Sequence, residues 1–349
     1  ILKIDALGLR TLSIIEDCLQ EIGKSKDFLL GVDLEDKETF KVFNEEKFAG
    51  VFQFEGYALQ SLCKQMGVNK FLDIAYITTL ARPGPLHSGG TTEFIKRHTG
   101  EEEVTHLHPM TKKWTEDSHG VIIFQEQVMQ IARSIGKLSW EDTSSLRKAM
   151  SKSLGEEFFN RYWELFKEGA KDQGIEEKEA KNIWEHMCTF GSWAFNKSHA
   201  ISYAMISYWC AYLKAHHSKE FAVACLRNAK DDEQIIKLLR ELVIEGFEYT
   251  PFDKDKSQLT WSVQDGKIVG GLLGVKGIGP KNAEDIINRR ATGKALTSRQ
   301  DVLVHNPEIP YMDVFETETR FGDYYKNPKR YNILTGDVSY IKSINENGE

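Results

Sequence analysis

Apolar residues recur at helical spacing along most of the chain. Within Thr11–Ile22, for example, Leu12, Ile15 and Leu19 lie three or four residues apart, and Gly23 follows as a stop signal. Similar patterns predict further helices at residues 36–44, 56–66, 71–80, 125–135 and 232–245. Nearly all of residues 140–226 is expected to be helical, with breaks near residues 154–155, 174 and 195–199. The sequence therefore predicts a mainly α fold.

The few apolar runs that favour β structure are short. Residues 2–7 and 50–54 are interpreted as strands, and the alternation of Leu259, Trp261 and Val263 predicts a small hairpin. We therefore expect short β segments beside a helical body.

Breaks in the helical pattern are expected at three places. The two prolines of Arg82-Pro83-Gly84-Pro85 predict a rigid turn after the preceding helix, because proline interrupts a helix interior. A loop-rich segment is expected at residues 87–118. Beyond Leu303 no periodic pattern continues, and a partly ordered tail is expected there.

The net charge of −7 argues against a simple electrostatic binder of nucleic acid. The charge is segregated, however, since residues 267–299 hold seven lysines and arginines but two acidic residues. Binding depends on the local field of a groove and not on the sum over the molecule. The negative total therefore weakens a nucleic-acid function only slightly.

Composition and cysteine usage exclude several classes of protein. The chain is 41% hydrophobic and 28% charged, as in ordinary soluble proteins, and no run of about eighteen apolar residues is present to span a membrane. Its five cysteines form no CxxC pair and no zinc-ligand cluster, so we expect reduced thiols in a cytoplasmic setting. Ile1 follows neither a methionine nor a signal-peptide pattern, and we interpret it as a start inside a larger protein.

The most specific local motif is the glycine-rich segment at residues 272–287, which resembles a helix-hairpin-helix element. Gly277 and Gly279 would let backbone N–H groups approach a phosphate, and the next helix start adds partial positive charge. The cations that would contact the DNA backbone are Lys276, Lys281, Arg289 and Arg290. A plain glycine-rich turn between two helices is the alternative.

A second motif is a basic helix face. Arg147 and Lys148 are adjacent, and Lys152 lies one turn beyond Lys148, so at least two cations share a face. Such a face could hold a triphosphate, with arginine supplying a bidentate fork. A basic helix face is also commonly just solvated, and that alternative stays open.

A third motif places several polar groups at an expected helix start, in the run Phe195-Asn196-Lys197-Ser198-His199. An imidazole and an amide at this position could contact a base or a sugar. A histidine at a helix start is also often a capping or core residue.

Asp5 is a carboxylate inside an apolar strand-like run. It either faces solvent at a strand edge or is a metal ligand held on a rigid element. Phosphoryl transfer with two magnesium ions needs carboxylates fixed on such elements. From this residue alone, solvent exposure is the simpler interpretation.

Taken in order along the chain, these segments resemble one family, the C-family replicative DNA polymerases (the bacterial DNA polymerase III alpha subunit). The resemblance covers about residues 1–300, and its motifs occur in the family's order. The matching blocks are Leu2–Leu12, Gly50–Glu55, Arg82–Leu86, Gln125–Met129, Leu146–Met150 and Phe195–His199, followed by the glycine-rich hairpin.

The resemblance implies roles for individual residues. Asp5 would be the third catalytic, metal-binding carboxylate of the palm, and Lys3 would touch the nucleotide or primer phosphates. Arg147, Lys148 and Lys152 would hold the incoming triphosphate. The residues that would line the nucleotide and template pocket are Asn196, Lys197 and His199, with Arg82 and Gln125 as weaker candidates.

The departures from the family pattern are equally informative. The family's first two catalytic aspartates, in an Asp-x-Asp arrangement, are absent, as are the thumb and most of the palm. The two Mg²⁺ ions would be shared with carboxylates of an upstream half, so this chain is expected to be inactive alone. Lys148 keeps the charge of a second family arginine but lacks its fork, which implies a different grip on phosphate.

The resemblance thus implies part of a DNA-directed DNA polymerase, in the bacterial cytoplasm or in the host cytoplasm for a phage-encoded chain. Expected partners are primer–template DNA, dNTP and the upstream half with palm, thumb and aspartate pair. The sliding clamp and other replisome proteins are further candidates. A non-catalytic DNA-binding protein and a subunit that binds only protein are the alternatives.

The expected architecture is a large helical fingers domain with short β segments, a palm-strand remnant and a small helix-hairpin-helix module. The expected boundaries place the palm strand at residues 1–12, the fingers at 13–250, the module at 251–303 and an irregular tail at 304–349.

Overall fold

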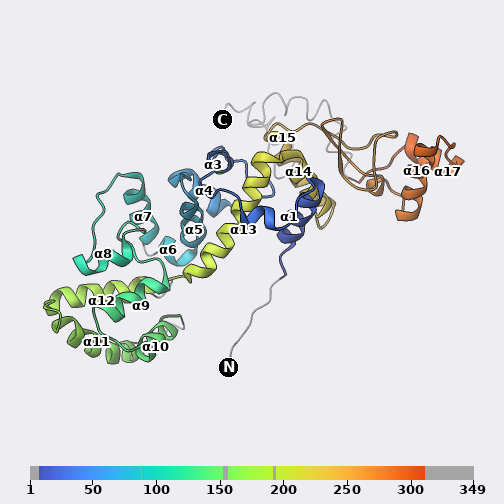
Figure 1. Ribbon diagram of the computed structural model, residues 1–349. Helices are drawn as coiled ribbons and strands as arrows, with labels where there is room; N and C mark the ends of the chain where they lie inside the picture. Colours follow the sequence, from blue (N-terminus) through green and yellow to red (C-terminus); the bar gives the residue numbers. More distant parts are fainter. Residues whose placement is uncertain (1–7, 88, 152–155, 192–193, 311–349) are drawn as a thin grey trace, which may run out of the picture. The chain divides into compact units, whose positions relative to one another are not determined.

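Helices make up most of the computed structural model, which describes residues 8–87, 89–151, 156–191 and 194–310 (Figure 1). The prediction of a mainly α fold is confirmed, and no helix in these ranges is long and apolar enough to cross a bilayer. The helices are α1 Arg10–Glu21, α2 Asp27–Leu30, α3 Lys37–Asn44, α4 Tyr57–Met66, α5 Phe71–Leu80, α6 Pro83–His87, α7 Gly90–Thr99, α8 Pro109–Thr115, α9 Gln125–Ser134, α10 Trp140–Ser151, α11 Glu156–Lys171, α12 Glu177–Gly191, α13 Lys197–His216, α14 Ser218–Arg227, α15 Asp232–Ile244, α16 Pro280–Thr292 and α17 Ser298–His305, with the 3₁₀ helix η1 at Leu272–Gly274.

The described residues fall into two compact units. Unit 1 comprises residues 8–33, 47–52 and 209–310, and unit 2 comprises the described parts of 34–46 and 53–208. The division falls within α13, whose first twelve residues, to Tyr208, belong to unit 2. The domain boundaries expected from the sequence at residues 12, 250 and 303 stay predictions.

Unit 1 contains a three-stranded sheet with the order β1-β3-β2. The hairpin predicted around residue 263 is confirmed, because β2 Ser262–Gln264 pairs antiparallel with β3 Lys267–Val269. Asp265 and Gly266 join the strands with φ values of 47° and 73°, the left-handed conformations that a tight two-residue hairpin turn requires. β1, at Tyr249–Thr250, adds a parallel edge to β3.

Three sequence-based predictions differ from the structure. Residues 50–54 form turns in place of a strand, with Gln53 at a φ of 66°. The expected rigid turn at the double proline is the short helix α6, since proline is tolerated in a first helical turn that needs no N–H donor. The expected loop at residues 87–118 contains α7 and α8, and α8 also starts with a proline.

In unit 2, helices α9–α12 enclose one apolar core around Ile131, Phe166 and Trp184. Figure 1 shows these four helices gathered together. At its centre two glycines touch through their backbones: a Cβ added at Gly169 would overlap the carbonyl of Gly136, and one added at Gly136 would overlap the ring of Phe166. The absence of side chains at both positions is what lets α11 approach the end of α9 so closely.

All five cysteines lie in the described ranges and are free thiols. Burial raises the pKa of Cys18, Cys63 and Cys188 to about 12, so these thiols stay protonated and unreactive near neutral pH. The expected reduced state of the cysteines agrees with this arrangement.

Unit 1 holds a buried ion pair between Lys214 of α13 and Glu245. The Lys214 ammonium lies 2.5 Å from the Glu245 carboxylate and donates a 2.7 Å hydrogen bond to the carbonyl of Ala49. The second carboxylate oxygen accepts the Ala49 N–H at 3.1 Å. Both side chains are almost inaccessible, at 4% and 7% exposure. Water therefore cannot solvate either charge if its partner is removed. The pair thereby fixes the turn that carries Ala49 onto α13.

Lys214→Met is expected to lower the free energy of unfolding by about 3–5 kcal/mol, because it leaves the buried Glu245 carboxylate without a counter-charge. The double variant Lys214→Met/Glu245→Leu should recover much of that loss, since it removes both charges. Urea denaturation followed by circular dichroism measures both. The exposed pair Lys41–Glu38 supplies the control, where Lys41→Met should change little. Equal losses in the single and double variants would contradict this account of the pair.

Unit 2 contains a pair of hydrogen-bonded histidines. His98 Nδ1 and His119 Nε2 are 3.0 Å apart, and both rings pack against Phe94. One ring must donate and the other accept, so the pair cannot bind two extra protons without losing the bond. Burial lowers the pKa of His119 from its ordinary 6.5, and the nearby His98 and Lys70 lower it further while Asp73 opposes them.

The free energy of unfolding should therefore be greatest above pH 6.5 and should fall on acidification, because the unfolded chain then takes up a proton that folded His119 resists. Denaturant titrations at a series of pH values measure the slope. His119→Asn keeps a residue that tolerates the φ of 52° and should reduce the slope. It should not abolish it, because burial also lowers the pKa of His106. A slope unchanged by the substitution would disprove the role of His119.

Candidate functional site

The first residues of α9 and α13 are held together by backbone pairing within unit 2. Phe124 and Phe195 form an isolated parallel bridge, although they are far apart in the sequence. The N–H of Gln125 donates to the Phe195 carbonyl at 2.9 Å, and the N–H of Phe195 donates to the Ile123 carbonyl at 3.0 Å. The two helices therefore begin side by side, and the side chains of their first turns gather at one place.

Glu126 reinforces this pairing with both carboxylate oxygens. One accepts a 2.8 Å hydrogen bond from the side-chain amide of Asn196, and the other accepts the backbone N–H of Lys197 at 2.9 Å. The side-chain oxygen of Asn196 in turn accepts the N–H of His199 at 2.8 Å and caps α13. Two backbone N–H groups at this helix start are thus satisfied by the chain itself.

Gln127 supports the paired starts of α9 and α13, which we call the junction, from the buried side. Its side-chain oxygen accepts the N–H groups of Ile123 and Phe124, both at 2.8 Å. Its amide nitrogen donates to the Trp114 carbonyl and the Ser118 hydroxyl, at 3.0 and 2.6 Å. The segment leading into α9 is therefore fixed before any ligand is considered.

Four planar groups lie in a row beside the junction. The guanidinium of Arg82 lies 3.6 Å from the centre of the Phe195 ring. Phe195 meets His199 edge-on at 5.2 Å, and His199 stacks on Tyr203 at 4.0 Å with an angle of 25°. Phe195 and Tyr203 are half-buried, whereas Arg82 and His199 are exposed. The row combines aromatic rings with an exposed imidazole and an exposed cation, a combination suited to planar ligands.

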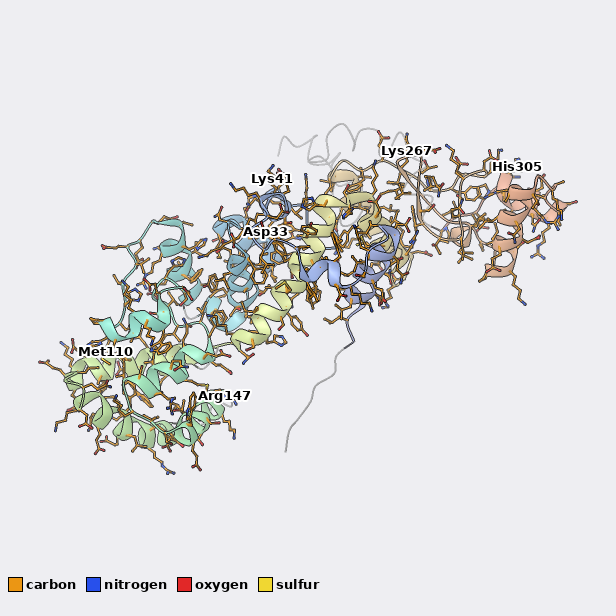
Figure 2. The ribbon with its side chains drawn as sticks, in the orientation of Figure 1. Asp33, Lys41, Met110, Arg147, Lys267 and His305 are labelled. Carbon is orange, nitrogen blue, oxygen red and sulfur yellow. The ribbon has the colours of Figure 1, made fainter. Side chains whose placement is uncertain are left out.

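Arg147 on α10 adjoins this row through Gln125. A 3.4 Å hydrogen bond runs from the Arg147 guanidinium to the side-chain oxygen of Gln125, whose backbone N–H donates to the Phe195 carbonyl. Figure 2 labels Arg147. Arg147 is half-buried and Lys148 is exposed. Lys197, from α13, has its ammonium 5.7 Å from the centre of the Phe124 ring.

Of the predicted pocket residues, the structure brings together Arg82, Gln125, Arg147, Asn196, Lys197 and His199. For Lys148 it shows only that the side chain is exposed. Lys3, Asp5 and Lys152, which were also predicted to bind nucleotide or metal, lie outside the described residues. Within the described ranges no group of three or more His, Cys, Asp or Glu side chains is arranged to hold a metal ion. The described residues therefore offer no ligand set for the expected Mg²⁺ ions.

Sequence reasoning missed Glu126, Gln127 and the stacking partners Phe195 and Tyr203 as parts of this site. A carboxylate in the first turn of a helix is a common signal, but its partners lie 70 and 71 residues away. The spacing of residues 195, 199 and 203 by four was a usable sign that their rings share a helix face.

The glycine-rich segment in unit 1 forms a turn followed by α16. Gly277 has a φ of 89°, a conformation that favours glycine. Gly279 is the N-cap of α16, and Pro280 follows it as the first residue of the helix. The element before the turn is the one-turn 3₁₀ helix η1. The backbone N–H of Lys276 donates to the Glu308 carbonyl at 2.8 Å and fixes the turn from outside.

The four predicted cations of this segment differ in their surroundings. Lys281 is exposed at the start of α16, and Lys276 is exposed but lies 2.6 Å from the Glu308 carboxylate. Arg289 pairs with Asp285 at 2.7 Å and donates to the Ala295 carbonyl. Arg290 is half-buried and donates to the carbonyl of Ser257 at 2.8 Å. The two lysines are therefore the more accessible cations.

Comparison with known proteins places these features in context. Residues 11–174 match the model of the bacterial DNA polymerase III alpha subunit finger domain. The chain is 33% identical over 307 residues to the DNA polymerase III subunit alpha of Aquifex aeolicus, a match that covers 87% of this chain and 26% of the relative. The same subunit of Thermus aquaticus is 33% identical over 317 residues, covering 88% and 26%. The chain thus spans about a quarter of the length of these curated relatives.

Glu126→Gln should weaken the junction, because the amide can accept only one of the two hydrogen bonds and presents a donor to the other. We expect a loss of about 1 kcal/mol in the free energy of unfolding, with faster hydrogen exchange at the start of α13. Exchange measured by mass spectrometry on peptides covering residues 194–200 tests this. Glu141→Gln, at an exposed position in the first turn of α10, is the matched control and should change neither quantity. Unaltered hydrogen exchange in Glu126→Gln would show that the Glu126 carboxylate does not stabilise the junction.

Proposed function

This chain carries the fingers region of a C-family DNA polymerase III alpha subunit, and we propose that the junction of α9, α10 and α13 in unit 2 receives the incoming nucleotide during DNA synthesis. The whole polypeptide would then be part of a DNA-directed DNA polymerase. It would supply nucleotide-binding surfaces and one catalytic carboxylate, and it would be inactive without a partner half.

The observation that carries the proposal is the row of planar groups next to a cation. Arg82, Phe195, His199 and Tyr203 form the row, and Arg147 adjoins it through Gln125. A nucleotide combines a planar base with a polyanion, so it matches a stacking surface with arginine beside it.

Phosphate binding at this site would depend on side chains and not on a helix end. Two of the first three N–H groups of α13, those of Lys197 and His199, are taken by Glu126 and Asn196. We therefore assign the triphosphate to Arg147 and Lys148, with Lys152 as a further candidate. Asn196, Lys197 and His199 would face the base or the sugar, while Arg82 and Gln125 brace the row.

Metal-assisted transfer of the nucleotide needs more carboxylates than the described residues bring together. We propose that Asp5 contributes one ligand of the two Mg²⁺ ions and that Lys3 lies near the phosphates. The other carboxylates would come from the partner half with palm and thumb. One carboxylate cannot position two metal ions, which is why the chain alone should not extend a primer.

The glycine-rich segment of unit 1 would hold the backbone of primer–template DNA. Gly277 and Gly279 give a turn without side-chain obstruction, and Lys276 and Lys281 are accessible. Arg289 and Arg290 would act mainly by keeping α16 in place, given their contacts with Asp285 and Ser257. The sliding clamp, other replisome proteins and a cytoplasmic location belong to the same proposal.

Magnesium-dependent primer extension tests the proposal. The chain should extend a primer only when a polypeptide carrying palm, thumb and the Asp-x-Asp pair is added, and Asp5→Ala should abolish the activity. Arg147→Ala should raise the KM for nucleotide about tenfold or more, because it removes a charged hydrogen-bonding group. Arg147→Lys should recover part of this, since the charge remains without the fork.

The matched control is Arg161→Ala. Arg161 is an exposed arginine on α11, which shares the apolar core of α9–α12, and its substitution is expected to leave KM unchanged. DNA binding that is indifferent to nucleotide, with no extension from the combined halves, would favour a non-catalytic DNA-binding protein. Extension with an unaltered KM in Arg147→Ala would refute the nucleotide site while leaving the polymerase assignment intact.

A further inference from the structure

Helix α10 begins with an exposed tryptophan that the nucleotide site does not use. Trp140 is 59% exposed, although a large aromatic side chain normally gains from burial. The guanidinium of Arg133, in the last turn of α9, lies 3.9 Å from the centre of the Trp140 ring. One face of the indole is therefore backed by a cation, and much of the ring stays accessible to solvent.

Trp140 and Arg147 lie on the same side of α10. They are seven residues apart, which is almost two helical turns and about 10 Å along the axis. The inner side of the helix is formed by Thr143, Leu146 and Ala149, all buried. Trp140 and Arg147 flank this buried stripe together.

The contacts with α9 confirm this alignment. Arg147 meets Gln125 in the first turn of α9, and Trp140 meets Arg133 in its last turn. The two helices therefore run antiparallel along a shared edge. That edge has the nucleotide site at one end and the indole at the other.

The charges around the indole are mixed, with two cations and two carboxylates nearby. Exposed Lys137 lies in the connection between α9 and α10, and Arg133 backs the ring. Glu141 is exposed on the next helical position. The Asp142 carboxylate is engaged with the Ser139 hydroxyl at 2.6 Å.

We propose that Trp140, backed by Arg133, stacks against an unpaired base of single-stranded DNA that runs along this edge from the site at Arg147. The inference rests on the proposed function and adds a binding position to it. Exposed aromatic rings among cations are how proteins bind single strands without reading sequence, since every base has a π face. The cation behind the ring strengthens the same interaction.

Binding of fluorescently labelled DNA to the full chain tests the inference by anisotropy. Three probes share one duplex: a blunt end, a single-stranded template overhang, and the same overhang built from abasic nucleotides. Trp140→Ala should weaken binding of the base-containing overhang about tenfold. It should leave the blunt and abasic probes unchanged, because these lack the unpaired base. Trp140→Phe should recover most of the loss, since a ring is retained.

Leu165→Ala is the matched control, because Leu165 is an exposed apolar residue of the same helical group, at 40% exposure. It should bind all three probes like the unaltered chain. Equal affinity of Trp140→Ala and the unaltered chain for the base-containing overhang would overturn the stacking role alone. An equal loss on all three probes would also overturn it, by showing a structural effect. A chain that binds none of the probes would overturn the proposed function together with this inference.

Discussion

The candidate site depends on one long-range pairing, the backbone bridge between Phe124 and Phe195 with the Glu126 carboxylate beside it. It forces α9 and α13 to begin at the same place. The first turn of a helix often carries polar side chains because they cap its free N–H groups. Bringing two helix starts together therefore gathers polar side chains from two distant parts of the sequence. Arg147 then reaches this cluster from α10 through its contact with Gln125.

Much of the helical framework could be predicted from the sequence, and the reason is local. α1, α4 and α5 follow apolar spacing, and the Asp265-Gly266 turn follows from backbone chemistry. The segments α6–α8 were missed because prolines and glycines suggest loops, although proline is well suited to a first helical turn. Asn196 and Arg147 were singled out from sequence motifs, and their roles stay predictions. Glu126 was not singled out, because its contacts exist only once distant segments meet.

The arginines show why counting charge along a sequence says little about ligand binding. Arg97 donates to Glu93, Glu102, Thr105 and the His119 carbonyl, so its guanidinium serves the fold of unit 2. Arg290 similarly serves the carbonyl of Ser257 in unit 1. The sequence gives these residues the same charge as Arg147. Only the surroundings separate a cation used internally from one beside a cluster of exposed polar groups.

The close approach of Gly136 and Gly169 has a consequence for how this sequence can evolve. Neither position can gain even a methyl group without moving a backbone, so substitutions at the two sites are coupled. A lineage that loses one glycine must first widen the spacing of α9 and α11, which would require new volumes at Phe166 and its neighbours. Single substitutions at these two glycines are therefore disfavoured, and replacement requires several changes together. Exposed positions on the same helices face no such packing constraint.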